Sequence, residues 1–499
     1  MHALLALGMI ITPVDPPPSV EVPRIKDSVT VDGRLDEAVW SRAAVLRGFH
    51  QYLPIDGRPA EDSTVVLVWY SETAIHFGIR AYEPHGPVQA TLADRDKISA
   101  DDFVEILLDT FDDRRQAFLF AVNPLGVQAD GLLNDASRST SSFGDQTSSS
   151  GAYVIDLSPD YVFQSVGRVT PWGYEVEIRI PFKSLRYQSA AEQTWGVNVI
   201  RHIQHSGYED TWSPVLQSDA SFLGKSGTLT GLSEIARNLV LDVNPEVTST
   251  TSGVPGAAGW SYDVGRPAIG GNARWGVSNN VFLNATVNPD FSQLEADVAQ
   301  IQYDPRDALF FPEKRPFFLD GLEQFATPNN LIYTRRLADP DAAVKLTGKI
   351  GSTNLALLSG VDGTSTSASG GHPVYNWLRV RRDVQGQSSL GLVYTDRIDG
   401  ADYNRVAAAD ARVVTGPYTL QFQGGGSLTR QNGVTTTAPT WTAAASGNGS
   451  RFGFTSSIRG FDPDFNAASG FVSRVGVVHA TVIPRVTFFG SHGAALESW

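Results

Sequence analysis

Cysteine is absent from the 499 residues of this chain, which excludes disulfide bonds, thiolate metal sites and a thiol nucleophile. Basic charge is scarce as well: 39 lysine and arginine residues stand against 53 acidic residues, giving a formal net charge of −14. Nucleic acid is bound through basic patches that neutralise phosphates, so this balance argues against a nucleic-acid partner. The sequence also lacks any run of about 18 apolar residues, which excludes a transmembrane helix.

Common catalytic motifs are missing too. The chain contains no G-x-S-x-G, no Walker-type phosphate loop and no G-x-G-x-x-G. What it does contain is 47 glycines and an aromatic content of 10%. This composition favours β strands joined by tight turns.

The N-terminus carries a short apolar segment followed by prolines. Residues 3–11 resemble the apolar core of a secretory signal, although no basic residue precedes them. We interpret residues 1–24 as a truncated signal peptide and a proline-rich linker. The alternative is an ordinary apolar tail.

Short alternating segments follow one another between residues 25 and 235. In residues 174–180 every second side chain is apolar, and the glutamates and arginine between them are expected to face water. Residues 103–108 alternate in the same way. Many short strands at regular spacing predict a β sandwich. Residues 137–151 are rich in serine, threonine and glycine and are expected to form a mobile loop.

From residue 239 onward the alternating segments change in character. Segments such as 281–287, 390–394 and 418–422 pair one apolar face with one small or polar face. About a dozen such segments precede residue 489, enough to close a membrane β barrel. The alternative is a second soluble sandwich or a twisted open sheet.

One unusual stretch interrupts this series of strands between Val287 and Ala343. Loops of this length are usually functional or plug-like. We expect its aromatic pairs to be anchors and its charges to form a cluster at a constriction or a domain joint; the alternative is a plain packing element between domains. The residues of this motif are Phe310, Phe311, Glu313, Lys314, Arg315, Phe317 and Phe318.

Several acidic residues and two histidines could be taken for catalytic or metal-binding groups. Glycoside hydrolysis needs two carboxyl groups across a cleft, whereas acids at turns usually cap backbone or face solvent. The histidines of an H-x-x-H on a strand point to opposite faces, which disfavours a shared metal. We therefore expect no catalytic residue, no metal and no cofactor. The residues considered are Asp32, Asp36, Glu37, Asp109, Asp112, Asp113, His202 and His205.

Four ordered motifs carry a resemblance in the first half: VDGRLDEAVW, DDFVEILLDTFDDRR, FAVNPLGVQADG and GYEVEIRIPFKSLR. Together they resemble the family 9 carbohydrate-binding module, which implies a sugar-binding β sandwich over residues 25–235. Members of that family clamp a sugar ring between tryptophans, one of them just before the D-x-V-E strand, where this chain has Ile98, Ser99 and Ala100. The carbohydrate-binding candidates are Trp69, Trp172 and Trp212; the alternative is that each is a core aromatic.

A second resemblance covers the rest of the chain. The strings NPDFSQLEAD, ALFFPEKRPFFLDG, IYTRR, AVKLTGKIG and DFNAASGFVSRVG resemble the DUF5916 class of bacterial proteins. In that class a family-9-like module precedes an outer-membrane-type barrel, which implies such a barrel over residues 236–499 with an inserted segment at 288–342. The family's barrel normally continues past the last of these motifs, so here it can be incomplete.

The sequence therefore predicts an all-β protein: an N-terminal β sandwich followed by an antiparallel, outer-membrane β barrel. The function we expect is non-enzymatic binding or admission of a glycan or related ligand, with lipid and other envelope proteins as further partners. The N-terminal domain would be periplasmic or surface-exposed. The alternatives are a glycoside hydrolase with an appended binding module and a structural protein of cell-envelope assembly.

Overall fold

The computed structural model describes residues 17–27, 29–135, 155–188, 190–235, 240–249, 251–257, 259–265, 267–291, 297 and 304–490. Within these residues the chain is built almost entirely from antiparallel strands, which confirms the all-β prediction. None of the helices described has the length and apolar character required to span a bilayer. The expected signal segment up to residue 16 and the expected loop at 137–151 lie outside the described residues.

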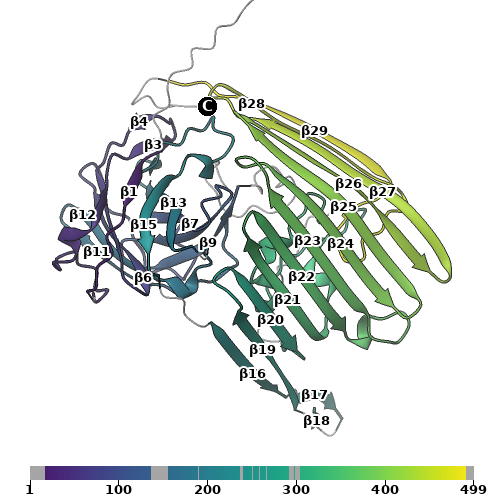
Figure 1. Ribbon diagram of the computed structural model, residues 1–499. Helices are drawn as coiled ribbons and strands as arrows, with labels where there is room; N and C mark the ends of the chain where they lie inside the picture. The colour runs from purple at the N-terminus through teal and green to yellow at the C-terminus, as the bar shows by residue number, and fades with distance from the viewer. Residues whose placement is uncertain are drawn as a thin grey trace, which may run out of the picture.

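Two sheets face each other in the N-terminal half (Figure 1). The larger sheet runs β10-β9-β8-β7-β13-β14-β3-β4, with β15 beside β13 and β1 parallel to β15; the smaller runs β11-β12-β6-β5-β2. The larger sheet comprises β1 (Ser19–Glu21), β3 (His50–Leu53), β4 (Arg58–Pro59), β7 (Phe103–Asp109), β8 (Gln116–Val122), β9 (Gln128–Asn134), β10 (Ile155–Asp156), β13 (Glu192–Ile203), β14 (Tyr208–Thr211) and β15 (Gly227–Ser233). The smaller sheet comprises β2 (Ala44–Leu46), β5 (Thr64–Tyr70), β6 (Ala74–Tyr82), β11 (Gln164–Thr170) and β12 (Gly173–Pro181).

The core of the sandwich lies between these sheets. Val104 and Ile106 from β7 and Val176 and Ile178 from β12 are fully buried in one cluster. Burying an aliphatic side chain of this size stabilises the fold by about 1.5–3 kcal/mol. The alternation in residues 103–108 and 174–180 therefore marks the core face, and the sandwich prediction is confirmed.

The opposite face of β12 differs from its prediction. Glu175 and Glu177 were expected to face water, yet both are buried. The turn at Asp32 and Gly33 folds over them, and both backbone N–H groups donate to Oε2 of Glu177, at 2.9 and 3.2 Å. Burial raises the pKa of Glu177 to about 7. The solvated face was a wrong prediction because period-2 alternation cannot show which loop will cover a polar face.

The C-terminal half forms a sheet of twelve antiparallel strands that lies beside the sandwich (Figure 1). Its strands follow the chain order β16, β19 and then β20 through β29, while β17 and β18 form a separate hairpin. Among the described residues β16 pairs only with β19, and β29 only with β28. The predicted series of antiparallel strands is confirmed, and in this part of the chain the sheet is open.

The strands of this half have the following bounds: β16 (Leu241–Thr248), β17 (Thr251–Gly256), β18 (Gly259–Val264), β19 (Ala268–Gly276), β20 (Val281–Val287), β21 (Pro340–Ile350), β22 (Thr353–Asp362), β23 (Val374–Asp383), β24 (Ser389–Asp399), β25 (Asp402–Thr415), β26 (Tyr418–Gln431), β27 (Val434–Gly447), β28 (Phe452–Phe461) and β29 (Val477–Val486). Short helical turns occur at η1 (Trp40–Arg42), η3 (Phe182–Ser184), η4 (Leu223–Lys225), α1 (Pro316–Leu319), η5 (Leu322–Phe325), η6 (Thr334–Arg336) and η7 (Thr364–Thr366).

The two faces of the twelve-stranded sheet differ in polarity. On β24 the apolar residues Leu390 and Leu392 are 56% and 61% exposed. The adjacent Val393 points to the opposite face and is buried. On β21 the buried positions of the other face include Lys345, Thr347 and Lys349. We call the face of Leu390 and Leu392 the outward face and that of Lys345 the inward face. The outward face is apolar and exposed, and the inward face is rich in buried polar groups.

Residues 288–339, here called the insert, connect two strands that are direct neighbours. β20 ends at Val287 as expected, and β21 begins at Pro340, slightly before the expected Ala343. The described part of the insert contains α1, η5 and η6 and packs on the inward face through contacts with β20, β22 and β23. An insert between adjacent antiparallel strands thus covers the polar side of the sheet.

Candidate functional site at the junction of sandwich, insert and sheet

The second aromatic pair of the insert is buried against the inward face. Phe318 is fully buried and Phe317 nearly so, in a cluster with Phe325 and Trp377. The rings of Phe325 and Trp377 lie 6.4 Å apart in an edge-to-face arrangement. These contacts fix α1 and η5 on the sheet, as expected for anchoring residues.

The first aromatic pair lies nearer the surface. Phe310 is 38% exposed, and its ring lies 5.2 Å from that of Tyr333 and 5.1 Å from that of Phe471. The backbone N–H of Phe311 donates to the Tyr333 hydroxyl, which in turn donates to the Phe311 carbonyl. This pair therefore joins the middle of the insert to Tyr333, near the end of the insert, and to Phe471 in the C-terminal segment.

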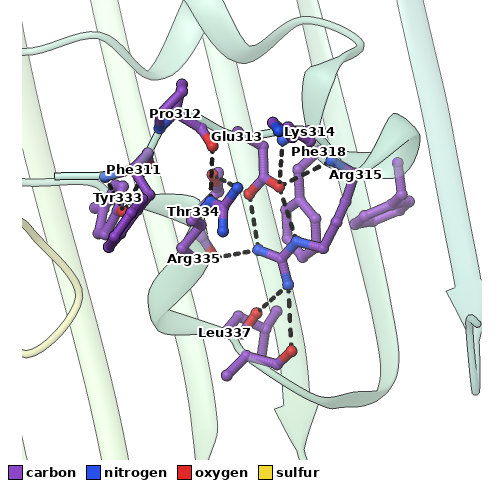
Figure 2. Close-up of polar contacts among 12 residues, drawn as sticks. Phe311, Pro312, Glu313, Lys314, Arg315, Phe318, Tyr333, Thr334, Arg335 and Leu337 are labelled. Atoms are coloured by element: carbon purple, nitrogen blue, oxygen red, sulfur yellow. Dashed lines mark hydrogen bonds and ion pairs between the residues drawn. The ribbon is translucent and has the colours of Figure 1, made fainter. Parts of the chain in front are cut away.

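Glu313 and Arg315 form a buried, bidentate ion pair at the centre of the insert (Figure 2). Nε and Nη2 of Arg315 donate to Oε1 and Oε2 of Glu313 at 2.8 and 2.7 Å. The remaining donors reach the carbonyls of Thr334 at 2.9 Å and Leu337 at 2.6 Å, and the guanidinium lies 4.0 Å from the Phe318 ring centroid. One arginine thereby joins the middle of the insert to its C-terminal end.

Burial alone would raise the pKa of Glu313, but the hydrogen bonds and charge of Arg315 outweigh it and lower that pKa. The Thr334 hydroxyl adds a hydrogen bond of 2.6 Å to the same carboxylate. Lys314 points elsewhere: its ammonium group lies 3.8 Å from the carboxylate of Asp297. The expected charge cluster thus consists of a buried pair and a separate, more exposed lysine.

A network of four charged side chains joins the sandwich to the sheet. Lys349 on β21 bonds Asp113 from the turn between β7 and β8, and also Asp383 on β23, at 2.7 Å. Arg115 from the same turn bonds Asp383. All four side chains are largely buried, so their hydrogen bonds position the turn against the strand ends.

Asp320, just after α1, links all three parts of the molecule. Its carboxylate accepts from Arg186 of the sandwich, from Arg274 of β19 at 3.1 Å and from Asn284 of β20 at 2.8 Å. Burial would raise the pKa of Asp320, but the surrounding cations, Arg186 foremost, hold it well below its usual range. The predicted fastening of the two domains by this motif is thus carried by Asp320 rather than by the phenylalanines.

A cavity of about 890 Å³ lies at this junction. Its walls combine aromatic rings, among them Phe111 and Tyr161, with charged groups of both signs, among them Lys183 and Glu323. Pockets of this size accommodate small to medium ligands. Hydrogen-bonding groups beside aromatic faces suit a polar, uncharged ligand.

The three tryptophans expected to contact sugar do not come together. Trp69 is fully buried on β5 and stacks on His76, with ring centroids 3.9 Å apart. Trp212 is buried in the core of the sandwich. Neither ring has a face open to a ligand, because both are enclosed by neighbouring side chains. Trp172 is partly exposed and packs on Tyr82 at 4.8 Å.

The acidic residues considered as catalytic candidates at and after the end of β7 form hydrogen bonds and ion pairs within their turn. Asp109 accepts from the backbone N–H groups of Phe111 and Arg114. Burial, followed by the charge of Asp113, raises the pKa of Asp109 to about 7. Asp112 pairs with Arg114 at 2.9 Å.

The same holds for the acids that follow the first turn. Glu37 accepts from the indole N–H of Trp40 at 3.1 Å, and Asp32 accepts from the N–H of Arg34 at 2.9 Å. Asp36 is exposed. These acids therefore stabilise local turns, as the sequence interpretation held.

The two histidines of the H-x-x-H lie in different surroundings. His202 stacks on Phe103 at 4.0 Å and lies between Glu105 and Glu209, at 3.5 and 3.4 Å. Burial would lower the pKa of His202, but these glutamates raise it to about 10. His205 instead contacts Glu83. No sequence signal identified the groups at the junction, Arg186 and Asp320, because they lie far apart in the chain.

A family model matches one segment of the C-terminal half. Residues 260–349 match the family described as "Domain of unknown function (DUF5916)". This range runs from β18 through most of β21 and includes the insert, so the predicted DUF5916 resemblance is confirmed there. No curated protein matches the chain.

Similar solved structures belong to carbohydrate-binding proteins. A family 9 carbohydrate-binding module from Caldicellulosiruptor kristjanssonii, in complex with cellotriose, is 15% identical over 44% of this chain and 98% of that chain, with a TM-score of 0.29. A putative carbohydrate-binding protein from Bacteroides uniformis is 13% identical over 43% of this chain and 99% of that chain, with a TM-score of 0.31.

Proposed function

We propose that this chain is a non-enzymatic protein of the bacterial outer membrane that binds a glycan or related polar ligand. In this proposal the outward face of the twelve-stranded sheet contacts lipid. The sandwich, the insert and the cavity between them remain in water. The observation that carries the proposal is the inverted polarity of the sheet.

Strand pairing aligns the outward side chains in rows across neighbouring strands. Leu346, Leu357, Leu378 and Tyr394 form one row across β21 to β24. The next row, on the side of the sandwich contacts, includes Leu355, Val380 and Leu392. Contiguous exposed apolar rows of this extent in a soluble protein would be a liability for aggregation. Contact with acyl chains removes that liability.

One row of the outward face is polar. This row lies two residues along each strand from the row of Leu357. Its outward residues pair across β22 to β25 and are Ser359, Asn376, Asp396 and Arg405. The guanidinium of Arg405 lies 3.2 Å from the Asp396 carboxylate. The row beyond it, formed by Val361, Val374 and Ile398, is apolar again. In the proposal the polar row marks the level of the lipid headgroups.

Strand lengths fit the same interpretation. β21 to β24 contain 11, 10, 10 and 11 residues. A tilted strand of about 9–11 residues crosses the hydrocarbon core of a bilayer. The inward charges, including Lys345 and Arg379, are covered by the insert and by partner strands and avoid lipid.

The cavity at the junction supports the ligand part of the proposal. Its mixed lining of aromatic and hydrogen-bonding groups resembles what sugar hydroxyls and C–H faces require. The sequence resemblance of the sandwich to family 9 carbohydrate-binding modules points to the same ligand class. Trp172 offers the other accessible aromatic surface among the residues considered.

Membrane location is tested by fractionating cells that express the full chain. We expect the protein in the outer-membrane fraction, extracted only by detergent and with heat-modifiable migration on gels. A detergent-free, monodisperse monomer would contradict the proposal.

Ligand binding is tested with the full chain on a glycan array, followed by titration of the best ligand. The double variant Lys183→Ala and Glu323→Gln, in the cavity lining, should weaken binding at least tenfold, since each lost hydrogen bond to a charged group contributes about 1.5–3 kcal/mol. Trp172→Ala tests the other candidate surface, and normal binding by this variant would keep the ligand in the cavity. The reverse pattern would move the site to Trp172, and a blank array would favour a structural role in envelope assembly.

A further inference from the structure

Three side chains converge at one end of the sandwich, away from the cavity. Asp62 precedes β5, Glu83 follows β6, and His205 lies in the turn between β13 and β14. One ligand atom from each lies within 4.8 Å of the other two, and Nε2 of His205 is 2.7 Å from Oε1 of Glu83. Asp62 and Glu83 are buried, whereas His205 reaches the surface.

A third carboxylate lies near this group. Asp210 is fully buried, and neither of its oxygens has a hydrogen-bond partner. It is directly opposite Arg201 in the pairing of β13 with β14, and the Arg201 guanidinium extends to Glu83. Asp210 therefore points into the same end of the interior. A buried carboxylate without partners costs several kcal/mol unless a cation or a proton neutralises it.

The charges at this end do not balance. Three buried carboxylates, Asp62, Glu83 and Asp210, face one buried cation, Arg201. His85 contacts Asp62 at 2.6 Å from the solvent side and is more than half exposed. His85 offsets part of this negative charge from the solvent side, and a divalent cation bound among the buried carboxylates would compensate the rest.

We propose that Asp62, Glu83 and His205 bind a divalent metal cation, Zn²⁺ or Mn²⁺. The negative charge of the nearby Asp210 would stabilise this cation without binding it directly. Two carboxylates and one imidazole form a mixed oxygen and nitrogen donor set that these ions accept. Ca²⁺ and Mg²⁺ prefer oxygen ligands alone and do not use the imidazole. This site is independent of the ligand cavity and of membrane contact.

The backbone supports this geometry. A side chain at Gly86 would meet the His205 ring at 2.5 Å, so the chain passes directly against the imidazole and limits its orientation. The three ligands come from both sheets, since Asp62 and Glu83 border the smaller sheet and His205 follows a strand of the larger. A bound ion would tie the two sheets together at their open end. It would therefore act on stability.

The test uses untagged full chain, stripped of metal with EDTA and dialysed. Thermal unfolding is followed with added ZnCl₂, MnCl₂ or CaCl₂, and the bound metal is counted by mass spectrometry. We expect one Zn²⁺ or Mn²⁺ per chain and a saturable rise in Tm, with no such effect of Ca²⁺. Cobalt substitution should give a visible absorption spectrum that reports ligation by nitrogen.

His205→Ala should remove the metal-dependent rise in Tm, measured against the Tm of the same variant without metal. His372→Ala is the matched control, since His372 also pairs with one carboxylate, at 2.6 Å from Asp341, but has no third ligand group in the described residues. Asp210→Asn should weaken metal affinity about tenfold and retain the cobalt spectrum.

Three results would overturn the proposal: no metal-dependent shift in the wild-type protein, a shift that survives His205→Ala, or stabilisation by Ca²⁺ alone. If His205→Ala fails to fold, His205→Asn provides a polar replacement with the same expected loss. A protein that binds metal but no glycan would refute the proposed ligand and leave the metal site standing.

Discussion

The two halves of the molecule have opposite polarity from inside to outside. In the sandwich, alternate positions such as Val176 and Ile178 meet their counterparts from the facing sheet in a dry core. In the twelve-stranded sheet the buried positions carry Lys345 and Arg379, and the apolar positions such as Leu392 are exposed. Period-2 alternation is common to both halves. What differs is which alternate set is covered: the apolar set in the sandwich and the polar set in the twelve-stranded sheet.

The strongest test of this comparison breaks the buried ion pair of the insert, the segment that covers the inward face. Arg315→Ala leaves Glu313 buried without its cation, and breaking a buried pair in this way costs about 3–5 kcal/mol of unfolding free energy. Lys314→Ala, one residue away and more exposed, should cost less than about 1 kcal/mol. Urea unfolding measures both. Equal effects would show that the insert does not depend on this pair.

The apolar anchors provide a second contrast within the insert. Phe318→Ala opens a cavity at a fully buried position and should cost about 3–5 kcal/mol. Phe310→Ala alters a partly exposed contact and should cost about 1 kcal/mol. The same unfolding experiment distinguishes them. A larger loss at Phe310 would place the main anchor at the C-terminal segment instead of the sheet.

The outward face is tested with a charge. Leu392→Arg should lower the stability of the protein folded in lipid vesicles by about 2–4 kcal/mol, because the band would meet hydrocarbon there. Ser359→Arg, in the polar row, should cost about 0–1 kcal/mol. If neither variant changes stability by more than about 0.5 kcal/mol, the face is in water.

The smallest expected effect is a pH dependence of opposite sign in the two halves. The folded-state pKa of Glu177 is about 7, raised from 4.5, so the folded sandwich binds its proton more tightly and loses stability as pH rises between these values. Glu177→Gln should therefore stabilise the protein by about 1–3 kcal/mol at pH 8 and have little effect at pH 4.

Glu313 behaves in the opposite way. The pKa of Glu313 is lowered in the folded state. Its contribution to the free energy of unfolding is therefore complete above the unfolded pKa of 4.5 and is lost as pH falls through the lowered pKa. Glu313→Gln should be destabilising at pH 8 and progressively less so in acid. Unfolding curves at pH 4, 6 and 8 for both variants measure the two slopes, and slopes of equal sign would contradict the assignment.

The sequence predicted those features that depend on local periodicity. Alternation identified the core face in residues 174–180 and the apolar face in residues 390–394, and the string around Phe310 marked the insert. The contacts that cover a face of a strand could not be predicted in this way. No residue near Glu177 in the sequence shows that residues 32 and 33 fold over it. The pairing of Lys349 with Asp113 joins residues far apart in the chain and required the three-dimensional structure.

The candidate site shows the same limit. The prediction placed sugar contacts at Trp69 and Trp212, but tryptophan side chains are highly buried on average, and composition does not show which of them reach the surface. The groups at the junction and at the proposed metal site come from separate segments. His205 was considered only together with His202, a near neighbour in sequence, whereas its carboxylate partners lie just before β5 and just after β6.

The position of the insert has a consequence for the order of folding. Pairing β20 with β21 closes a loop of about fifty residues, at an entropic cost of roughly 3–4 kcal/mol. The contacts of Arg315 with Glu313, Thr334 and Leu337 lie within the loop, so the insert can become compact before the strands meet. A slip of one residue would exchange the two faces of a strand. A preformed insert that fits only the side chains of the inward face would then select the register in which the sheet continues to assemble.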